Sequence, residues 1–229
     1  MAMNRRDFLR MSAALTAAGM SPSLFAATKE QFTIYGAPAM PSVTIAVAAA
    51  QGKLAKQADV ALEIWRSPDQ LRAGVASGQF KVMMSPSNVG VNLRNQGQQV
   101  GMVNILTNGI TQLMCKSTPI TSPQELVGKK ILVPFKNDMP DIVLQALLKK
   151  LNIDINKVDI TYAATPTEAI GLFLLKDFHA AILPEPMASA VVLKAKIVGT
   201  EIVRGFDLVK EWGQAFNTKP LIPMAGIIA

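Results

Sequence analysis

The sequence contains very little cysteine and histidine, with one of each in 229 residues. A single cysteine cannot form a disulfide within the chain, and Cys115 with His179 cannot supply the ligands of a Cys/His zinc site. A Cys–His nucleophilic pair would require these two residues to meet. Each lies in an apolar, strand-like segment, which favours a buried thiol for Cys115 and a surface or strand-end imidazole for His179.

Several motifs that carry chemistry are also absent. The sequence contains no Gly-x-Ser-x-Gly elbow, no phosphate-binding P-loop and no Gly-x-Gly-x-x-Gly fingerprint. The net charge is +7, but no run of Lys and Arg alternates with aromatic residues, which make up only 6% of the chain. We therefore predict no catalytic residues, no cofactor, no bound metal and no nucleic-acid partner.

Residues 4–10 read Asn-Arg-Arg-Asp-Phe-Leu-Arg and precede a mildly apolar run over residues 11–20. This run is too short to span a bilayer, which takes roughly 20 apolar residues. The segment resembles the twin-arginine signal family, with Asn4 in place of the usual Ser or Thr and Arg10 in place of Lys. That resemblance implies export to the periplasm in the folded state.

We expect residues 1–26 to be the signal peptide, with cleavage near Ala26 or Ala27. Removing its three arginines and one aspartate lowers the net charge from +7 to +5. Two alternatives remain at the level of the sequence. The segment is a basic amphipathic first helix of a cytosolic protein, or Phe25 blocks cleavage and the segment stays as an anchor.

The rest of the chain alternates between strand-like and helix-length segments. In residues 140–151 the leucines at 144, 147, 148 and 151 form one apolar stripe, which predicts an amphipathic helix. Such alternation predicts α/β architecture with mostly parallel strands and helices on both faces. Strands are predicted at residues 32–35, 60–65, 80–84, 100–106, 110–116, 130–133, 159–162, 180–183 and 221–229.

Proline recurs where helices are expected to begin, a position that tolerates its missing N–H group. Three of these starts also read as capping boxes, with Ser67, Ser122 or Thr165 at the cap and Glu or Gln three residues later. In an open α/β sheet such helix starts share one edge with the strand ends, where ligands bind. The prolines are Pro41, Pro68, Pro86, Pro123, Pro140, Pro166 and Pro186.

The predicted elements fall into two α/β lobes. Residues 28–108 form the first lobe and residues 109–215 the second, with Thr107-Asn108-Gly109 as a hinge crossing between two apolar strands. Residues 216–229 read as a strand that returns to the first lobe.

Three stretches then carry a family resemblance: residues 70–82, residues 122–131 (Ser-Pro-Gln-Glu-Leu-Val-Gly-Lys-Lys-Ile) and residues 164–186, which end in Leu-Pro-Glu-Pro. They resemble the periplasmic substrate-binding proteins of ABC importers, in particular the nitrate/sulfonate/taurine and thiamine-precursor group. The resemblance implies a two-lobe periplasmic binding protein type 2 fold with mixed, mostly parallel sheets. It also implies a small-molecule ligand and a membrane permease as partners, and a monomer. Because such proteins continue beyond the returning strand, we expect a chain truncated at its C-terminus.

If the ligand binds at the strand ends, the two lobes offer a defined set of candidate contacts. Ser85 and Ser87 are the strongest, because hydroxyls and helix N–H groups together suit an oxyanion. Lys136 also suits an anion, whereas Asp138 and Glu185 favour an amine, so a zwitterionic or aminopyrimidine-like ligand is slightly preferred. The candidates are Pro38, Met40, Ser67, Ser85, Ser87, Asn88, Asn137, Asp138, Met139, Thr165 and Glu185.

Two other functions compete with solute capture. The first is a periplasmic enzyme, since thiamine-pyrimidine synthases share the fold that the resemblance implies. Their cysteine-rich motif and metal-binding histidines have no counterpart in a chain with one Cys and one His. The second is a sensory ligand-binding domain that feeds a separate signalling chain.

Overall fold

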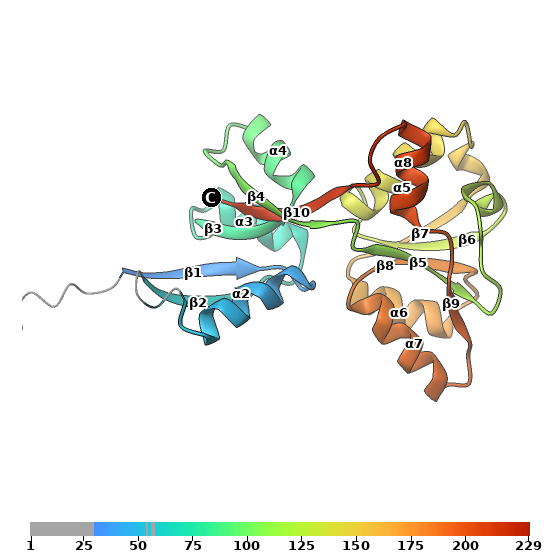
Figure 1. Cartoon of the computed structure of the whole chain (residues 1–229), viewed down its shortest axis with the longest axis horizontal. Helices are drawn as coiled ribbons and strands as arrows, with labels where there is room; N and C mark the ends of the chain where they lie inside the picture. The colour runs from blue at the N-terminus through green and yellow to red at the C-terminus, as the bar shows by residue number, and fades with distance from the viewer. Residues whose placement is uncertain (1–29, 54, 56–57) are drawn as a thin grey trace, which may run out of the picture.

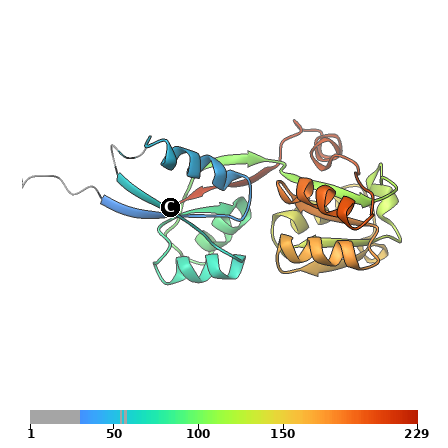
Figure 2. The same cartoon turned by 90° about the horizontal axis from the view of Figure 1, so that it is seen from below.

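The computed structural model describes residues 30–53, 55 and 58–229. The predicted signal peptide and its cleavage site lie outside these residues. The described chain forms two lobes, each built around a five-stranded sheet, and two segments connect them (Figures 1 and 2). No helix of the described residues is long and apolar enough to cross a membrane.

Lobe 1 contains the sheet with strand order β2-β1-β3-β10-β4. Its helices α2, α3 and α4 each follow a parallel strand, as in a βαβ unit. The elements are β1 (Glu30–Gly36), α2 (Pro41–Ala50), β2 (Ala58–Ile64), α3 (Pro68–Ala76), β3 (Val82–Pro86), α4 (Ser87–Asn95), β4 (Met102–Asn108) and β10 (Pro223–Ile228).

Lobe 2 contains the sheet with strand order β7-β6-β8-β5-β9. Helices α6 and α7 lie together on one side of this sheet and α5 and α8 on the other (Figure 1). The elements are β5 (Thr111–Lys116), η2 (Pro123–Leu126), β6 (Lys130–Pro134), α5 (Met139–Lys150), η3 (Ile155–Lys157), β7 (Asp159–Ala163), α6 (Pro166–Leu175), β8 (Ala180–Pro184), α7 (Met187–Ile197), β9 (Ile202–Arg204) and α8 (Leu208–Phe216).

Each sheet contains one strand that runs against its neighbours: β10 in lobe 1 and β5 in lobe 2. These are the two strands that the chain enters after crossing from the other lobe. β5 follows β4 directly, and β10 follows α8 of lobe 2. A strand entered from the opposite side runs antiparallel, so the crossings themselves explain the mixed character of both sheets.

The predicted α/β fold with mixed, mostly parallel sheets is confirmed, and every predicted strand is present with bounds shifted by one or two residues. The sequence missed the short strand β9. Proline begins α2, α3 and α6, whereas Pro86 and Pro186 lie one residue before their helices. The capping box predicted at Ser122 is wrong, because Pro123–Leu126 is a 3-10 helix and Ser122 makes no cap hydrogen bond.

The lobes differ in how they are packed. Lobe 2 has two apolar clusters on opposite faces of its sheet, one including Leu147 of α5 and the other Phe173 of α6. Lobe 1 has one cluster, which includes Leu71 and Met83. A small fourth cluster, around Met224, joins β10 to α5 and α8 beside the crossings.

Candidate functional site

A small cavity lies between the two lobes, at the carboxyl ends of the parallel strands. Its volume is about 70 Å³. Both crossing strands and the segments that lead into α2 to α7 contribute to its wall. The lining residues are Ala37, Pro38, Ala39, Trp65, Pro86, Ile110, Thr111, Phe135, Met139, Pro140, Pro166, Pro184, Met224 and Ala225.

The wall of this interlobe cavity is apolar. Trp65, Phe135, Met139 and Met224 supply its largest side chains. The indole N–H of Trp65 is already donated to the Met84 carbonyl at 2.9 Å. Proline also occupies the first or second position of α5 and α6, where other residues would offer a free backbone N–H. The cavity is therefore a poorer site for a bare oxyanion than helix starts usually provide.

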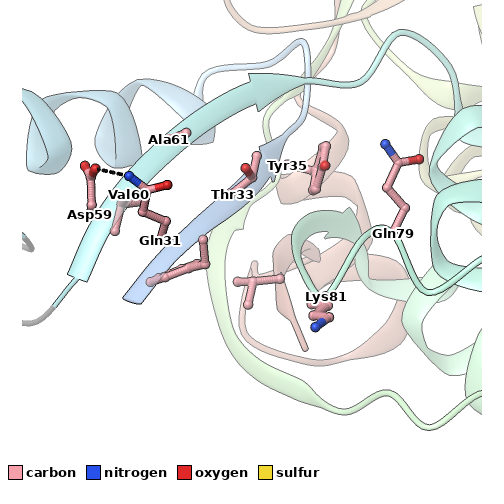
Figure 3. Close-up of a pocket in the computed structure, with 10 residues that line it drawn as sticks. Gln31, Thr33, Tyr35, Asp59, Val60, Ala61, Gln79 and Lys81 are labelled. Atoms are coloured by element: carbon pink, nitrogen blue, oxygen red, sulfur yellow. Dashed lines mark hydrogen bonds between the residues drawn. The ribbon is translucent and has the colours of Figure 1, made fainter. Parts of the chain in front are cut away.

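A larger groove of about 790 Å³ lies at the opposite end of lobe 1 (Figure 3). It is lined by lobe 1 alone, and Gln31 and Asp59, which share a 3.1 Å hydrogen bond, mark its position at the starts of β1 and β2. Ligands of open α/β sheets bind at the other, carboxyl ends of the strands. Because the interlobe cavity lies at those ends and is lined by residues of both lobes, we take it as the candidate site.

Two of the residues predicted from sequence, Pro38 and Met139, line the cavity. Met40 lies at its rim, 47% exposed, where its backbone N–H faces the Glu185 carbonyl of lobe 2 at 3.4 Å. This long contact is one of the points at which the lobes meet.

Three of the predicted hydroxyl residues form hydrogen bonds to nearby backbone groups. Ser67 and Thr165 accept hydrogen bonds from the backbone of Gln70 and Glu168, so they serve as the N-caps of α3 and α6. Ser85 is fully buried and donates to the Pro86 carbonyl. None of these residues lines the cavity.

Ser87 connects segments that are far apart in the sequence. Its hydroxyl is 2.8 Å from the Pro223 carbonyl of β10 and 3.6 Å from the Met139 sulfur of lobe 2. It therefore lies where lobe 1, β10 and the start of α5 converge.

Asp138 forms the most extensive polar contact between the lobes. Its carboxylate is only 2% exposed and accepts hydrogen bonds from Arg72 of α3, at 3.2 and 3.3 Å, and from Asn88 of α4, at 3.0 Å. Asp138 and Asn88 were predicted at the site, but Arg72 was not. The sequence offers no signal for it, because Arg72 lies in the second turn of its helix and its partner is 66 residues away.

Asn137 is held by a buried network in lobe 2. Its backbone N–H donates to Asp141 at 2.8 Å, and the same carboxylate accepts from Gln145 and from the Tyr162 hydroxyl. Burial, together with this bond to Asp141, raises the pKa of Tyr162 to about 12. The network fixes the loop between β6 and α5 and leaves Asn137 itself exposed.

Glu185 directly follows β8 and begins the short connection to α7. Its partial burial acts to raise the pKa of the carboxyl, but hydrogen bonds from Arg204, at 2.7 Å, and from the Ser189 N–H outweigh that effect and lower it. Glu185 is therefore an ion-paired carboxylate beside the cavity. Within the described ranges, no group of three or more His, Cys, Asp or Glu residues is placed to hold a metal ion.

Two α/β lobes joined by two crossings, with a cavity between their strand ends, are the architecture of the periplasmic binding protein fold. The chain belongs to the NMT1/THI5-like family, which it matches over residues 40–213. Residues 2–22 match the signal sequence of the twin-arginine translocation pathway, so the predicted periplasmic export is confirmed. No curated protein matches the chain.

Solved structures share this fold at low sequence identity. The periplasmic aliphatic sulphonate binding protein SsuA of Escherichia coli aligns with a TM-score of 0.67 and 16% identity over 87% of this chain. An ABC transporter protein of Parabacteroides distasonis aligns with a TM-score of 0.63 and 19% identity over 88% of this chain. This chain spans 65% of the length of each of them. A histidine kinase sensor domain also aligns, with a TM-score of 0.56 and 13% identity, over 88% of this chain and 83% of its own.

Proposed function

We propose that this protein is the solute-binding component of an ABC importer, which captures a small molecule between its lobes and presents it to a membrane permease. The observation that carries the proposal is the cavity enclosed by both lobes and both crossing strands. Membership of the NMT1/THI5-like family and the twin-arginine signal support it. The role is one of binding rather than catalysis, so a ligand recovered from the protein should be chemically unchanged.

The ligand class follows from the cavity wall. Trp65, Phe135 and Met139 suit a ring or short alkyl group, whereas the prolines at the helix starts reduce the N–H groups available to a bare anion. Glu185 is paired with Arg204, so beside the cavity it offers carboxylate oxygens as acceptors for an amine rather than net negative charge. We therefore rank an amine-bearing or aminopyrimidine-like molecule first, a sulfonate with an alkyl group second, and a nitrate-like anion last.

Binding on this scheme requires the lobes to move. A cavity of about 70 Å³ is far smaller than the roughly 300 Å³ or more that ligand sites usually enclose. The ligand must therefore enter an opened cleft and be enclosed when the lobes return. Hinge closure of this kind is established for two-lobe binding proteins.

Ligand-dependent thermal stability tests the proposal directly, using the exported chain and a panel of aminopyrimidines, amines and alkanesulfonates. A specific ligand at a hundred times its dissociation constant stabilises the folded state by about 2.7 kcal/mol. Ala39→Phe, which fills the cavity wall, should abolish the shift. Val43→Phe places the same side chain on an exposed position of α2 and should preserve it. A ligand whose effect survives Ala39→Phe binds elsewhere and contradicts the proposed site.

A sensory role is the second candidate, because a histidine kinase sensor domain shares the fold. The two roles differ in what is lost when the gene is deleted. Loss of ligand uptake supports import, whereas unchanged uptake with loss of a transcriptional response to the same ligand supports sensing.

A further inference from the structure

The polar contact between the lobes has an unusual origin at the start of α5. Asp138 occupies the N-cap position, yet its side chain makes no hydrogen bond to its own helix. Asp141, in the first turn, accepts the backbone N–H of Asn137 instead. The Asp138 carboxylate therefore does not cap α5, although the N-cap position predicts that it would.

Among the described residues, the side-chain hydrogen bonds of that carboxylate all come from lobe 1. Arg72 and Asn88 donate to both of its oxygens, and the carboxylate retains 2% exposure. A buried carboxylate without such partners would be strongly disfavoured. The arrangement therefore exists only while the lobes are together, and parting them exchanges its hydrogen bonds for water.

The two partners on lobe 1 differ in what else they contact. Asp69, one turn earlier on α3, binds the other terminal nitrogen of Arg72 at 3.1 Å. Asn88 turns its amide nitrogen toward the carboxylate, which leaves its buried oxygen without a partner among the described residues. Orienting the amide in this way avoids placing two acceptors together, which indicates that Asp138 determines its position.

This set of residues borders the interlobe cavity without lining it. Met139, which follows Asp138, and Pro86, which lies two residues before Asn88, are both part of the wall. The contact therefore lies beside the site, and none of its three residues lines the cavity.

We propose that Arg72, Asn88 and Asp138 form an interlobe latch that holds the lobes together with no ligand bound. Asp138, for which the sequence predicted ligand contact, becomes a positioning residue that acts through the geometry of the lobes. A latch of this kind increases ligand affinity, because it raises the fraction of molecules already in the closed form. It also slows ligand entry, because the lobes must part first.

The separation of the lobes can be measured in the absence of any ligand, so this test is independent of the proposed function. Nitroxide labels at Val43→Cys of α2 and Ser189→Cys of α7 lie on exposed first-turn positions of helices on opposite lobes, and Cys115 is fully buried. Pulsed electron double resonance then gives the distribution of distances between the labels. We expect one short distance in the otherwise unchanged chain.

Asp138→Asn is the decisive variant, because asparagine also favours the N-cap position and keeps the size of the side chain. Hydrogen bonds to charged groups are stronger than those to neutral groups, so losing the Asp138 charge should lower the ratio of closed to open molecules about tenfold. Asp69→Asn is the control, because it removes the other carboxylate that pairs with Arg72. Asp69 is 94% exposed and belongs to the same lobe as Arg72, so this change should leave the distance distribution unchanged. An unchanged distribution in Asp138→Asn, or equal opening in Asp69→Asn, would overturn the latch.

Coupling between the two ionic partners provides a second measurement. Arg72→Gln should open the lobes as much as Asp138→Asn, and the double variant should open them no further than either single change. Independent, additive effects would show that the residues do not act as a pair. Circular dichroism of each variant before measurement establishes that the fold is retained.

Discussion

The two lobes have the same strand topology but bury their sheets to different extents. In lobe 2 all five residues of β8 are buried, and apolar clusters cover both faces of the sheet. In lobe 1 the edge strand β4 is exposed at six of its seven positions, with Thr107 partly buried. Its apolar side chains include Val103, which is 63% exposed, and Ile105, which is 40% exposed.

This difference shows that strand order and core completion are separate properties. Both lobes place three parallel strands and their helices in the same way, so both present strand ends to the cavity. Lobe 1 also covers both faces at the centre of its sheet, where the adjacent residues Met83 and Met84 of β3 are both fully buried, but it leaves the edge strand β4 exposed. We infer that lobe 2 supplies most of the stability and that the edge of lobe 1 contributes little.

The largest effect is expected from a direct comparison of apolar truncations in the two lobes. Leu147→Ala, in a fully buried position of α5, should reduce the free energy of unfolding by about 3 kcal/mol. Val103→Ala, on exposed β4, should cost less than about 0.5 kcal/mol. Urea unfolding followed by circular dichroism measures both. Equal losses would show that β4 is as firmly packed as α5 and would break the comparison.

A second, smaller effect tests the close approach of β4 to β10. A Cβ atom at Gly226 of β10 would collide with the Asn104 carbonyl of β4. Gly226→Ala should therefore destabilise the protein by about 2 kcal/mol, because backbone must shift to accept it. Gly171→Ala is the matched control: it lies in α6 with open space around it and should stabilise by up to about 1 kcal/mol. A Gly226→Ala variant as stable as the original chain would show that β10 and β4 can separate at little cost.

Most of the fold could be predicted from the sequence, because it depends on local patterns. The leucine stripe of residues 140–151 and the prolines at helix starts are periodic or positional signals, and the structure places helices there. The short strand β9 was not predicted, because three residues are too few to show the alternation of apolar and polar side chains that marks a strand. The helix predicted after Ser122 was wrong, because a sequence typical of a helix cap can also precede a 3-10 helix.

The site was less predictable, because its contacts join distant segments. The sequence identified the loops at the strand ends, and Pro38 and Met139 of that set line the cavity. The caps predicted at Ser67 and Thr165 are confirmed, and neither residue lines the cavity. The sequence could not foresee that Asp138 pairs with Arg72 across the lobes. Trp65 was overlooked as a lining residue, although it directly follows β2 and could have been found by that position.

The ionisation of the Tyr162 phenol tests the packing of lobe 2 separately from lobe 1. The chain has two tyrosines, so Tyr35→Phe leaves Tyr162 as the single phenol. Its pKa is raised to about 12 in the folded state, above the ordinary value of 10, so its contribution to stability is fully present below pH 10 and is lost as the pH rises towards 12. Ultraviolet titration should therefore show a midpoint near 12 in the folded protein. A midpoint near 10 with the fold intact would mean that the contact with Asp141 does not persist in solution.

The smallest change in stability is expected on the exposed edge of lobe 1. An edge strand without charge or proline is a template for pairing with other chains, and β4 carries neither from Met102 to Asn108. Val103→Lys should alter the free energy of unfolding by less than about 0.5 kcal/mol, yet reduce light scattering when the protein is heated. Ser189→Lys adds the same charge on exposed α7 of lobe 2 and serves as the control for net charge. If both variants reduce scattering equally, charge alone explains the effect. If only Val103→Lys does, the incompletely covered edge of lobe 1 is the part of the molecule that associates.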